Sequence, residues 1–340
     1  MSSTPVREER VAPHSERTTV DRGDGSDPAR APVVPDVTVT IVTYDCREDV
    51  LRCIDTIRGG ASRCGAEVVV VDNDSHDGVV DAIRERHPEV VVVERRTNAG
   101  FGRSHNLAAA HASGRYILVL NPDTVVEAGA LDEMIDFADA RQAEGRPVGV
   151  VAPMLLNPDG TDQRTARSFP TASAGVFGRR SPLTRWFPNN RWSRRFLRAD
   201  QVDRSRPWTV DWVSGAAMLV PRDLFESIGG FDPDFFMHFE DAELCARVGA
   251  EGRDVWCVPQ ARIVHHEGGS RRGWPVSQIW HFHRGAYLFD RKVRHPNATD
   301  PRRWLTAGLL GVRLIATVLL NVVQRITTVR HPDGSAQPDT

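Results

Sequence analysis

The sequence is poor in cysteine, and its five thiols form no recognisable motif. Their number is odd, no two are spaced as CxxC, and they lie in apolar segments, which argues against a disulfide framework and a zinc cluster. Net charge is also small, at −2 over 340 residues, so no overall field favours nucleic acid as a partner. No long apolar run opens the chain, so no secretory signal is expected. These absences predict a reduced, cytoplasmic protein.

What the sequence does contain is an alternation of apolar strands and helical segments. β-Branched runs at residues 37–44, 67–71, 90–93 and 115–120 alternate with helical patterns, which predicts an α/β fold. Because these strands are apolar throughout, we expect a mostly parallel, Rossmann-like sheet with helices on both faces. Ligands of such sheets bind at the carboxyl ends of the strands. The first candidate site residues are the polar ones at those ends: Thr43, Tyr44, Asp72, Asn73 and Asp74.

A glycine loop follows the third strand, at residues 98–106. His105 stands where a dinucleotide fingerprint has its last glycine, and the loop does not follow the first strand, so a nicotinamide oxidoreductase is disfavoured. Gly100 and the helix start behind it can hold phosphate through backbone N–H groups, with Arg103 adding charge. A plain tight turn is the alternative interpretation.

The fourth strand ends in Asn121-Pro122-Asp123. Asp123, held by the stiff proline, can offer oxygen ligands to a divalent cation that bridges two phosphates. His265 ends a later strand and can complete such a metal site. The alternatives are an Asx turn at Asp123 and a structural role for His265.

An acidic helix start lies at Glu240-Asp241, directly after the aromatic segment 235–239. The helix dipole and free backbone N–H groups favour the ionised carboxylates there. Desolvation by the neighbouring phenylalanines raises a carboxyl pKa instead, which suits a general base. An ordinary pair of capping acids is the alternative interpretation.

Two stretches of the chain are strongly basic. Residues 163–206 hold eleven arginines with interleaved aromatics, a pattern compatible with RNA, with a diphosphate or anionic lipid headgroup, or with a solvated loop. Residues 271–330 hold eleven basic residues around the mainly apolar stretch 305–323. Arg313 in the middle of that stretch is costly for a membrane span, so we expect a helix at the surface of an anionic membrane. A core or dimer helix is the alternative.

These patterns divide the chain. Residues 1–35 are predicted to be a disordered arm and 331–340 a disordered tail. Residues 36–150, and 151–270 with the basic insertion 163–206, form two halves of the globular part; the resemblance given next implies that the first binds the nucleotide sugar and that the second binds the acceptor and is catalytic. Residues 271–330 form a basic, amphipathic helical region.

Taken in order, these motifs resemble the family 2 inverting glycosyltransferases of GT-A fold. The resemblance covers about residues 37–289 and adds Gly229-Gly230-Phe231-Asp232 to the motifs above. It implies a divalent cation, Mg²⁺ or Mn²⁺, held by Asp123 and His265, and a catalytic pair in which Asp241, beside Glu240, deprotonates the acceptor. It implies contacts to a nucleotide-sugar donor from Thr43, Tyr44, Asp72, Asn73, Asp74, Gly100, Arg103, Asn106 and Asn121. It implies acceptor contacts from Trp212, Ser214, Gly215 and His238.

Two residues depart from the family pattern. Asn121 replaces the first carboxylate of the DxD motif, which bears on metal dependence. Asn73 stands where many members place the aspartate that reads the base, so either Asn73 or Asp72 is expected to contact the pyrimidine.

Within the family, the chain looks most like rhamnosyltransferases of bacterial cell-wall assembly. The resemblance is in residues 120–124, 212–215 and 236–241 and in the basic tail. It implies transfer of L-rhamnose from dTDP-rhamnose to a polyprenyl-diphosphate-linked saccharide by a peripheral protein on the inner face of the plasma membrane, with a homodimer as a further possibility. The alternatives are UDP-galactofuranose, UDP-GlcNAc or GDP-mannose as donor, a polysaccharide acceptor, and a non-catalytic membrane scaffold.

Overall fold

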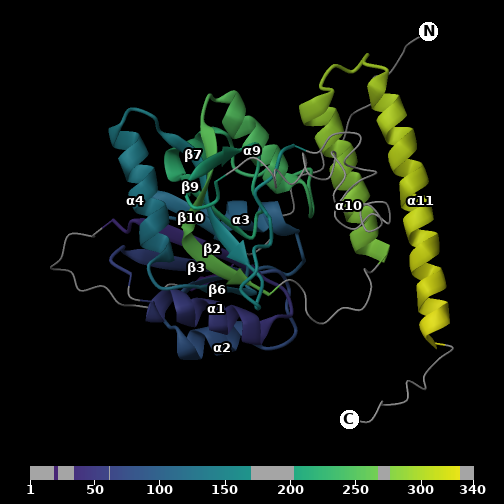
Figure 1. Ribbon diagram of the computed structural model, residues 1–340. Helices are drawn as coiled ribbons and strands as arrows, with labels where there is room; N and C mark the ends of the chain where they lie inside the picture. Colours follow the sequence, from purple (N-terminus) through teal and green to yellow (C-terminus); the bar gives the residue numbers. More distant parts are fainter. Residues whose placement is uncertain (1–18, 22–33, 61, 170–202, 267–275, 330–340) are drawn as a thin grey trace, which may run out of the picture.

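The computed structural model describes residues 19–21, 34–60, 62–169, 203–266 and 276–329 (Figure 1). They form one sheet of ten strands with helices packed on both faces, so the predicted α/β class is confirmed. In chain order the elements are β1 (Thr19–Asp21), β2 (Val37–Thr43), α1 (Arg47–Gly59), β3 (Ala66–Asp72), α2 (Val79–Arg86), β4 (Val91–Glu94), α3 (Phe101–Ala109), β5 (Tyr116–Leu120), β6 (Thr124–Val126), α4 (Ala130–Ala143), β7 (Val148–Leu156), β8 (Trp208–Val210), β9 (Ala217–Pro221), α8 (Arg222–Ser227), α9 (Glu240–Ala250), β10 (Asp254–His265), α10 (Val276–Phe289), η1 (Asp290–Arg294) and α11 (Arg302–Val329).

The sheet brings the ends of distant strands to one edge. Its order is β1-β4-β3-β2-β5-β9-β7-β10-β6, with β8 also paired to β10. β2, β3, β4 and β5 are mutually parallel, and β9 runs antiparallel to both β5 and β7. β7 and β10, which pair in parallel, therefore run in the same direction as the first four. The carboxyl ends of all six strands lie at the same edge, where the candidate site residues were expected.

Two apolar layers cover the sheet, and both follow from the alternation of side chains along the strands. On one face, α1, α2 and α4 bury Ile54, Ile83 and Met134 against the odd-numbered residues of β2. On the other face, α8, α9 and α10 pack around Phe231 and Leu244. The core is thus continuous beneath the edge that carries the polar loops.

One element differs from the pattern expected of the sequence. β6 is only three residues long and was not predicted. β10 runs twelve residues and ends at His265 as expected, and a register shift between Val258 and Arg262 carries its pairing past Pro259, which has no N–H to donate.

The predicted disordered regions are described only in part. Within residues 1–35, β1 pairs antiparallel with β4 at the edge of the sheet, so this piece of the predicted arm is a strand. Residues 1–18 and 22–33, most of the basic insertion (170–202), and the tail from 330 onward lie outside the described residues.

Candidate active site

Asp123 and His265 meet at the edge where β5 and β10 end. After β5 the chain turns at Pro122 and returns as β6, which pairs antiparallel with the last residues of β10, placing Thr124 opposite His265. This register brings the Asp123 Oδ1 to 3.2 Å from the His265 Nε2. The two expected metal ligands therefore lie side by side.

Gln163 fixes the orientation and the tautomer of His265. It is buried, with 1% of its surface exposed. Its Nε2 donates to the His265 carbonyl at 2.7 Å, so its Oε1 is the atom that faces the ring, 3.0 Å from Nδ1. Since that oxygen can only accept, Nδ1 carries the proton of the neutral ring and Nε2 presents a lone pair. Sequence reasoning missed Gln163, because it lies where the periodic pattern breaks down.

The Asp123–His265 pair has the donor set and the spacing that a metal ion requires. The buried Asp123 Oδ1 has no hydrogen-bond partner, and the atom facing it is the His265 lone pair. Two acceptors in contact are unfavourable unless a cation lies between them. Ligand atoms about 2.1 Å from one octahedral ion lie about 3 Å apart, which matches the observed 3.2 Å. Within the described ranges no third His, Cys, Asp or Glu joins the pair.

Asn121, the departure from the DxD pattern, lies beside this pair. With the proton of His265 on Nδ1, the Asn121 Nδ2 donates to the His265 Nε2 at 3.2 Å, so the lone pair that faces Asp123 already accepts this N–H. The Asn121 backbone N–H donates to the Ala216 carbonyl at 2.9 Å, which ties the end of β5 to the start of β9. The adjacent Gly215 N–H donates to Asp241 at 3.0 Å. These hydrogen bonds connect the Asp123–His265 pair, through Asn121, Ala216 and Gly215, to Asp241 at the start of α9.

Glu240 and Asp241 open α9 after a strained turn. His238 and Phe239 both have left-handed backbone angles, with φ of 71° and 72°. Consecutive non-glycine residues seldom adopt this conformation, and such strain concentrates at functional sites. Gly285 of α10 packs against the turn so closely that a Cβ there would lie 2.4 Å from the His238 carbonyl oxygen. A helix of the C-terminal region therefore holds the turn that aims the carboxylates.

The two carboxyl groups have different surroundings. Burial raises the pKa of Glu240 to about 8, and the charge of Asp241 adds to the rise. Burial also raises the pKa of Asp241, but its carboxylate accepts the N–H groups of Gly215 and Ala242, at 3.0 and 2.7 Å, which oppose the rise. The Glu240 Oε2 has no hydrogen-bond partner. The two N–H groups that Asp241 accepts make it the more readily ionised member of the pair, and a proton shared by the two carboxyl groups favours Glu240.

Glu240→Gln is expected to remove one pH dependence of stability. The folded-state pKa of Glu240 lies above its ordinary 4.5, so ionisation favours the unfolded chain and wild-type stability falls as the pH rises from 4.5 to about 8. The glutamine variant lacks this titration, so its Tm should gain on that of wild type across the interval. Thermal melts at about pH 5 and about pH 8 measure the difference. Equal differences at both values would contradict a buried proton on Glu240.

The loops after β2 and β3 carry residues that the sequence predicts to contact the nucleotide-sugar donor. Asp72 is buried, its Oδ2 accepts the Ser75 N–H at 3.2 Å, and its Oδ1 has no partner. Burial raises the pKa of the Asp72 carboxyl. Tyr44 is exposed at the end of β2, and Asp74 is partly exposed in a left-handed turn. This edge therefore holds a buried carboxylate oxygen without a hydrogen-bond partner and an exposed aromatic ring.

Three side chains predicted to contact the donor form hydrogen bonds within the protein. The Asn73 Oδ1 accepts the Ser104 hydroxyl at 2.7 Å, and the Thr43 hydroxyl lies buried, 3.2 Å from the Cys46 sulfur. The Asn106 amide spans the backbone of Phe231, donating to its carbonyl at 2.7 Å and accepting its N–H at 2.8 Å. These side chains hold the loops together, and of the two residues expected to contact the pyrimidine, Asp72 is the one with an oxygen that no protein group occupies.

The glycine loop is fitted to the aromatic segment 235–239. Gly100 has φ of 86°, and a Cβ there would lie 2.2 Å from the Phe236 carbonyl oxygen. That oxygen accepts the Phe101 N–H at 2.9 Å. Arg103 is exposed, and its Nε donates to the Pro233 carbonyl at 2.8 Å. The loop therefore connects the nucleotide-binding half to the segment before the carboxylates.

The predicted acceptor residues surround the same carboxylates. Gly215 contacts Asp241 directly, and Ser214 precedes it. His238 lies in the strained turn. Trp212 is buried, and its indole N–H donates to the Ser168 carbonyl at 3.0 Å, so it supports the wall of the site rather than facing it.

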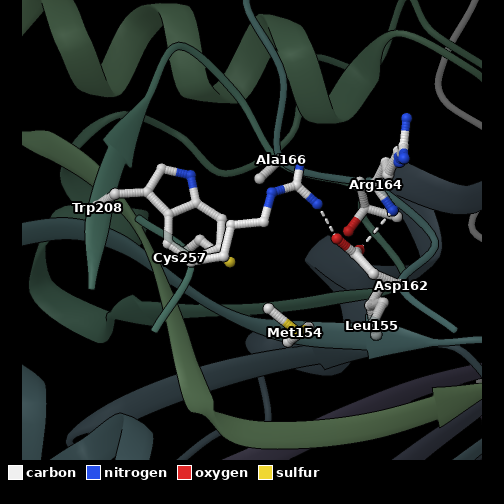
Figure 2. A pocket seen from close by; sticks show the side chains of 9 residues that line it. Met154, Leu155, Asp162, Arg164, Ala166, Trp208 and Cys257 are labelled. Atoms are coloured by element: carbon white, nitrogen blue, oxygen red, sulfur yellow. Dashed lines mark hydrogen bonds and ion pairs between the residues drawn. The ribbon is translucent and has the colours of Figure 1, made fainter. Parts of the chain in front are cut away.

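A hollow beside β7 and β10 is too small to be a substrate site. Figure 2 shows Met154, Asp162, Trp208 and Cys257 around it, and its volume is about 10 Å³, room for one water at most. Asp162 forms an ion pair with Arg204 there. This contact joins the described chain before residue 170 to the described chain after residue 202.

Of the C-terminal helices, α10 packs against the aromatic segment 235–239. α11 lies on the far side of α10 from the sheet (Figure 1). The His281 ring of α10 stacks on Phe236 at 4.3 Å between centroids, and Phe282 meets Phe239 edge-on at 5.3 Å. α11 packs along α10. The outer face of α11 is apolar and exposed, and one helix, over residues 302–322, is long and apolar enough to cross a membrane.

The whole arrangement has solved counterparts. The structure is similar to the mannosyltransferase of Pyrobaculum calidifontis solved with GDP-Man and Mn²⁺, with a TM-score of 0.50, 20% identity, and coverage of 88% of this chain and 82% of that one. The fold is thus of the GT-A type.

Sequence comparison gives the family. Residues 38–229, more than half of the chain, match the model for Glycosyl transferase family 2, and the chain belongs to that family. It is 30% identical over 286 residues to the N-acetylglucosaminyl-diphospho-decaprenol L-rhamnosyltransferase of Mycobacterium tuberculosis, covering 81% of this chain and 90% of that protein. It is 24% identical over 191 residues to the rhamnosyltransferase WbbL of Escherichia coli, covering 54% and 67%. The family resemblance inferred from the motifs is confirmed.

Proposed function

We propose that this glycosyltransferase moves L-rhamnose from dTDP-rhamnose, with inversion at the anomeric carbon, to a saccharide carried on a polyprenyl diphosphate. The observation that carries the proposal is the Asp123–His265 pair, 3.2 Å apart, which hydrogen bonds through Asn121, Ala216 and Gly215 connect to Asp241. The sugar and the lipid diphosphate are supported by the name of the mycobacterial relative.

The donor lies along the ends of β2, β3 and β5. The free Asp72 Oδ1 accepts an N–H of the pyrimidine, and Tyr44 packs beside the base. Asp123 and His265 would hold a divalent cation, Mg²⁺ or Mn²⁺, beside the diphosphate of the donor. When bound, such an ion neutralises the charge that develops on the leaving nucleoside diphosphate.

Asp241 acts on the acceptor. Its ionised carboxylate, oriented by the Gly215 and Ala242 N–H groups, takes the proton of the attacking hydroxyl. The hydroxyl oxygen bonds to the anomeric carbon as the bond to the diphosphate oxygen breaks, so configuration inverts in a single displacement. Because Glu240 is neutral, no second negative charge lies beside Asp241, and Asp241 can act as the base.

Gln163→Leu should weaken metal binding by about tenfold, because loss of a group that orients a metal-binding histidine commonly costs 10–100-fold in affinity. The leucine removes the acceptor that holds the Nδ1 proton, so the ring no longer presents Nε2 to Asp123. Calorimetric titration with Mn²⁺ measures the change. Gln260→Leu is the matched control, since Gln260 is exposed and bonds only the Ser205 carbonyl. Equal Mn²⁺ affinities in wild type and Gln163→Leu would contradict the assigned role.

The outer face of α11 attaches the enzyme to the membrane that carries its acceptor. Trp304, Leu309 and Leu319 are among its exposed residues, whereas Arg313 turns to the opposite side, 5.5 Å from the Phe282 ring centroid. A one-sided apolar helix with basic residues at its start suits the interface of an anionic bilayer. We propose a peripheral position on the cytoplasmic face.

The test of this function is a transfer assay with a polyprenyl-diphosphate-linked N-acetylglucosamine acceptor. Four labelled donors are compared: dTDP-rhamnose, UDP-galactofuranose, UDP-GlcNAc and GDP-mannose. Transfer is expected from dTDP-rhamnose. Transfer from one of the other three in its place would overturn the donor assignment, and transfer only to free polysaccharide would overturn the acceptor.

A further inference from the structure

A basic cavity lies between the C-terminal helices and the loop that precedes the carboxylates. Its volume is about 400 Å³, and its wall comes from η1, the start of α11 and the loop at 232–234, through Asp234, Leu288, Arg291, Lys292, Pro296 and Arg303. None of these residues belongs to the motifs that define the donor site. The cavity is therefore a feature apart from the Asp123–His265 edge.

Cations outnumber carboxylates around this loop. Lys292 lies 2.5 Å from both Asp232 and Asp234, which accounts for the two acidic groups present. Arg291 bonds the Tyr287 hydroxyl at 3.2 Å, and no described carboxylate forms an ion pair with Arg291 or Arg303. Two further arginines bond the carbonyls of the same loop, Arg284 at Asp234 and Arg103 at Pro233. Three cations therefore line the cavity, Arg291, Lys292 and Arg303, and Lys292 alone is paired with carboxylates, so the excess positive charge selects an anion.

The cavity opens where the apolar face of α11 begins. Arg303 lines the cavity, and the next residue, Trp304, has 77% of its surface exposed. The exposed large residues that continue along this helix carry no charge: Leu305, Leu309, Val312, Ile315, Leu319, Leu320 and Val322. A face of this kind lies among acyl chains, and a tryptophan at its end lies at headgroup level. A phosphate of the bilayer surface is therefore at the height of Arg303.

The loop that lines the cavity continues along the chain into the turn before the carboxylates. Asp234 is followed by the segment 235–239, which packs on Gly100 and on α10 and ends at Glu240-Asp241. A group held at Arg291 and Arg303 is thus anchored between the bilayer face and the carboxylates. An acceptor whose sugar is attached to a lipid through a diphosphate needs an anchor in this position.

We propose that Arg291, Lys292 and Arg303 bind the diphosphate of the lipid-linked acceptor at the membrane surface. The assignment of that diphosphate rests on the proposed function, whereas the binding of a lipid-borne phosphate rests on the cavity alone. The anionic headgroup of a phospholipid presents the same chemistry, and the experiment separates the two sources.

The experiment compares wild type with Arg291→Ala/Arg303→Ala in vesicle co-sedimentation. The vesicles are phosphatidylcholine alone, phosphatidylcholine with phosphatidylglycerol, and phosphatidylcholine with a polyprenyl-diphosphate-linked sugar. Charge-assisted bonds of about 1.5–3 kcal/mol predict a loss of at least about tenfold for the vesicles that hold the lipid diphosphate. The matched control is Arg146→Ala/Arg222→Ala, which removes two arginines from the opposite edge of the sheet and should bind as wild type does.

Each vesicle-binding result either supports the proposal or overturns it. A loss confined to the diphosphate vesicles supports the proposal, whereas an equal or larger loss on phosphatidylglycerol overturns the diphosphate as the ligand and leaves a headgroup site. Unchanged binding to all vesicles overturns the cavity as a phosphate site. Calorimetric binding of dTDP is expected to be unaltered and verifies the fold; Arg303→Gln repeats the test if the double variant does not fold. If vesicle binding depends on the cavity but no donor supports sugar transfer, the proposed function is wrong and the phosphate site in the cavity stands.

Discussion

Asp241→Asn should lower kcat by about 100- to 10,000-fold, the contribution typical of a positioned general base. The amide is nearly the size of the carboxylate, and its oxygen can still accept the Gly215 N–H, so the start of α9 and its strained turn are kept. It cannot take the proton of an attacking hydroxyl. Chemistry is therefore lost while the donor, which lies along other strand ends, still binds.

The measurement is single-turnover sugar transfer together with calorimetric binding of dTDP. Two variants on the same helix serve as comparisons. Glu240→Gln should retain most activity, because Glu240 is already protonated at neutral pH, and Glu251→Gln changes an exposed acid at the end of α9. Transfer by Asp241→Asn at near the wild-type rate would refute the assignment of the base, as would a greater loss in Glu240→Gln than in Asp241→Asn.

The sequence predicts the fold well, because the apolar strands and the polar residues after them are local signals. The strands at 37–44, 67–71 and 115–120 and the start of α9 at Glu240 were located to within a residue or two. The resulting edge follows from chain direction alone, since parallel strands present their carboxyl ends together.

What the sequence does not reveal depends on pairing between distant residues. Only the register of β6 on β10 shows that Asp123 and His265 are neighbours, and Gln163 becomes significant only once its amide is seen to span His265. Asn73 and Asn106 have the chemistry of ligand-binding residues, yet their partners are Ser104 and the backbone of Phe231. A polar side chain near a site is as easily used to hold it together as to bind a ligand.

Arg313 shows the same limit for the membrane helix. In sequence it interrupts an apolar stretch, and this counted as a cost against insertion. The structure turns it toward α10, over the Phe282 ring, and leaves the outer face of α11 without a charge from Trp304 to Val322. The side of a helix that a residue occupies decides whether its charge meets lipid, and composition cannot report it.

Asp123→Ala should abolish the metal-dependent part of nucleotide binding, raising the Kd of dTDP in Mn²⁺ by at least about 100-fold, beyond the range that loss of an outer-shell group costs. The change removes one of the two protein atoms that converge on the proposed ion, and with Asn121 in place of the first DxD carboxylate no acidic neighbour substitutes for it. Metal affinity here rests on fewer charges than a full DxD motif supplies, so the effect of losing Asp123 should be large.

The measurement is calorimetric titration of dTDP in Mn²⁺, in Mg²⁺ and in chelator, with wild type, Asp123→Ala and Glu127→Gln, an exposed acid just beyond β6. Wild type and Glu127→Gln should bind tightly only with metal, and Asp123→Ala should bind equally weakly in all three buffers. If wild type bound dTDP with the same Kd in chelator as in Mn²⁺, Asp123 and His265 would not form a metal site. The leaving diphosphate would then depend on cationic side chains of the protein, and an exposed arginine such as Arg103 would become the first residue to replace.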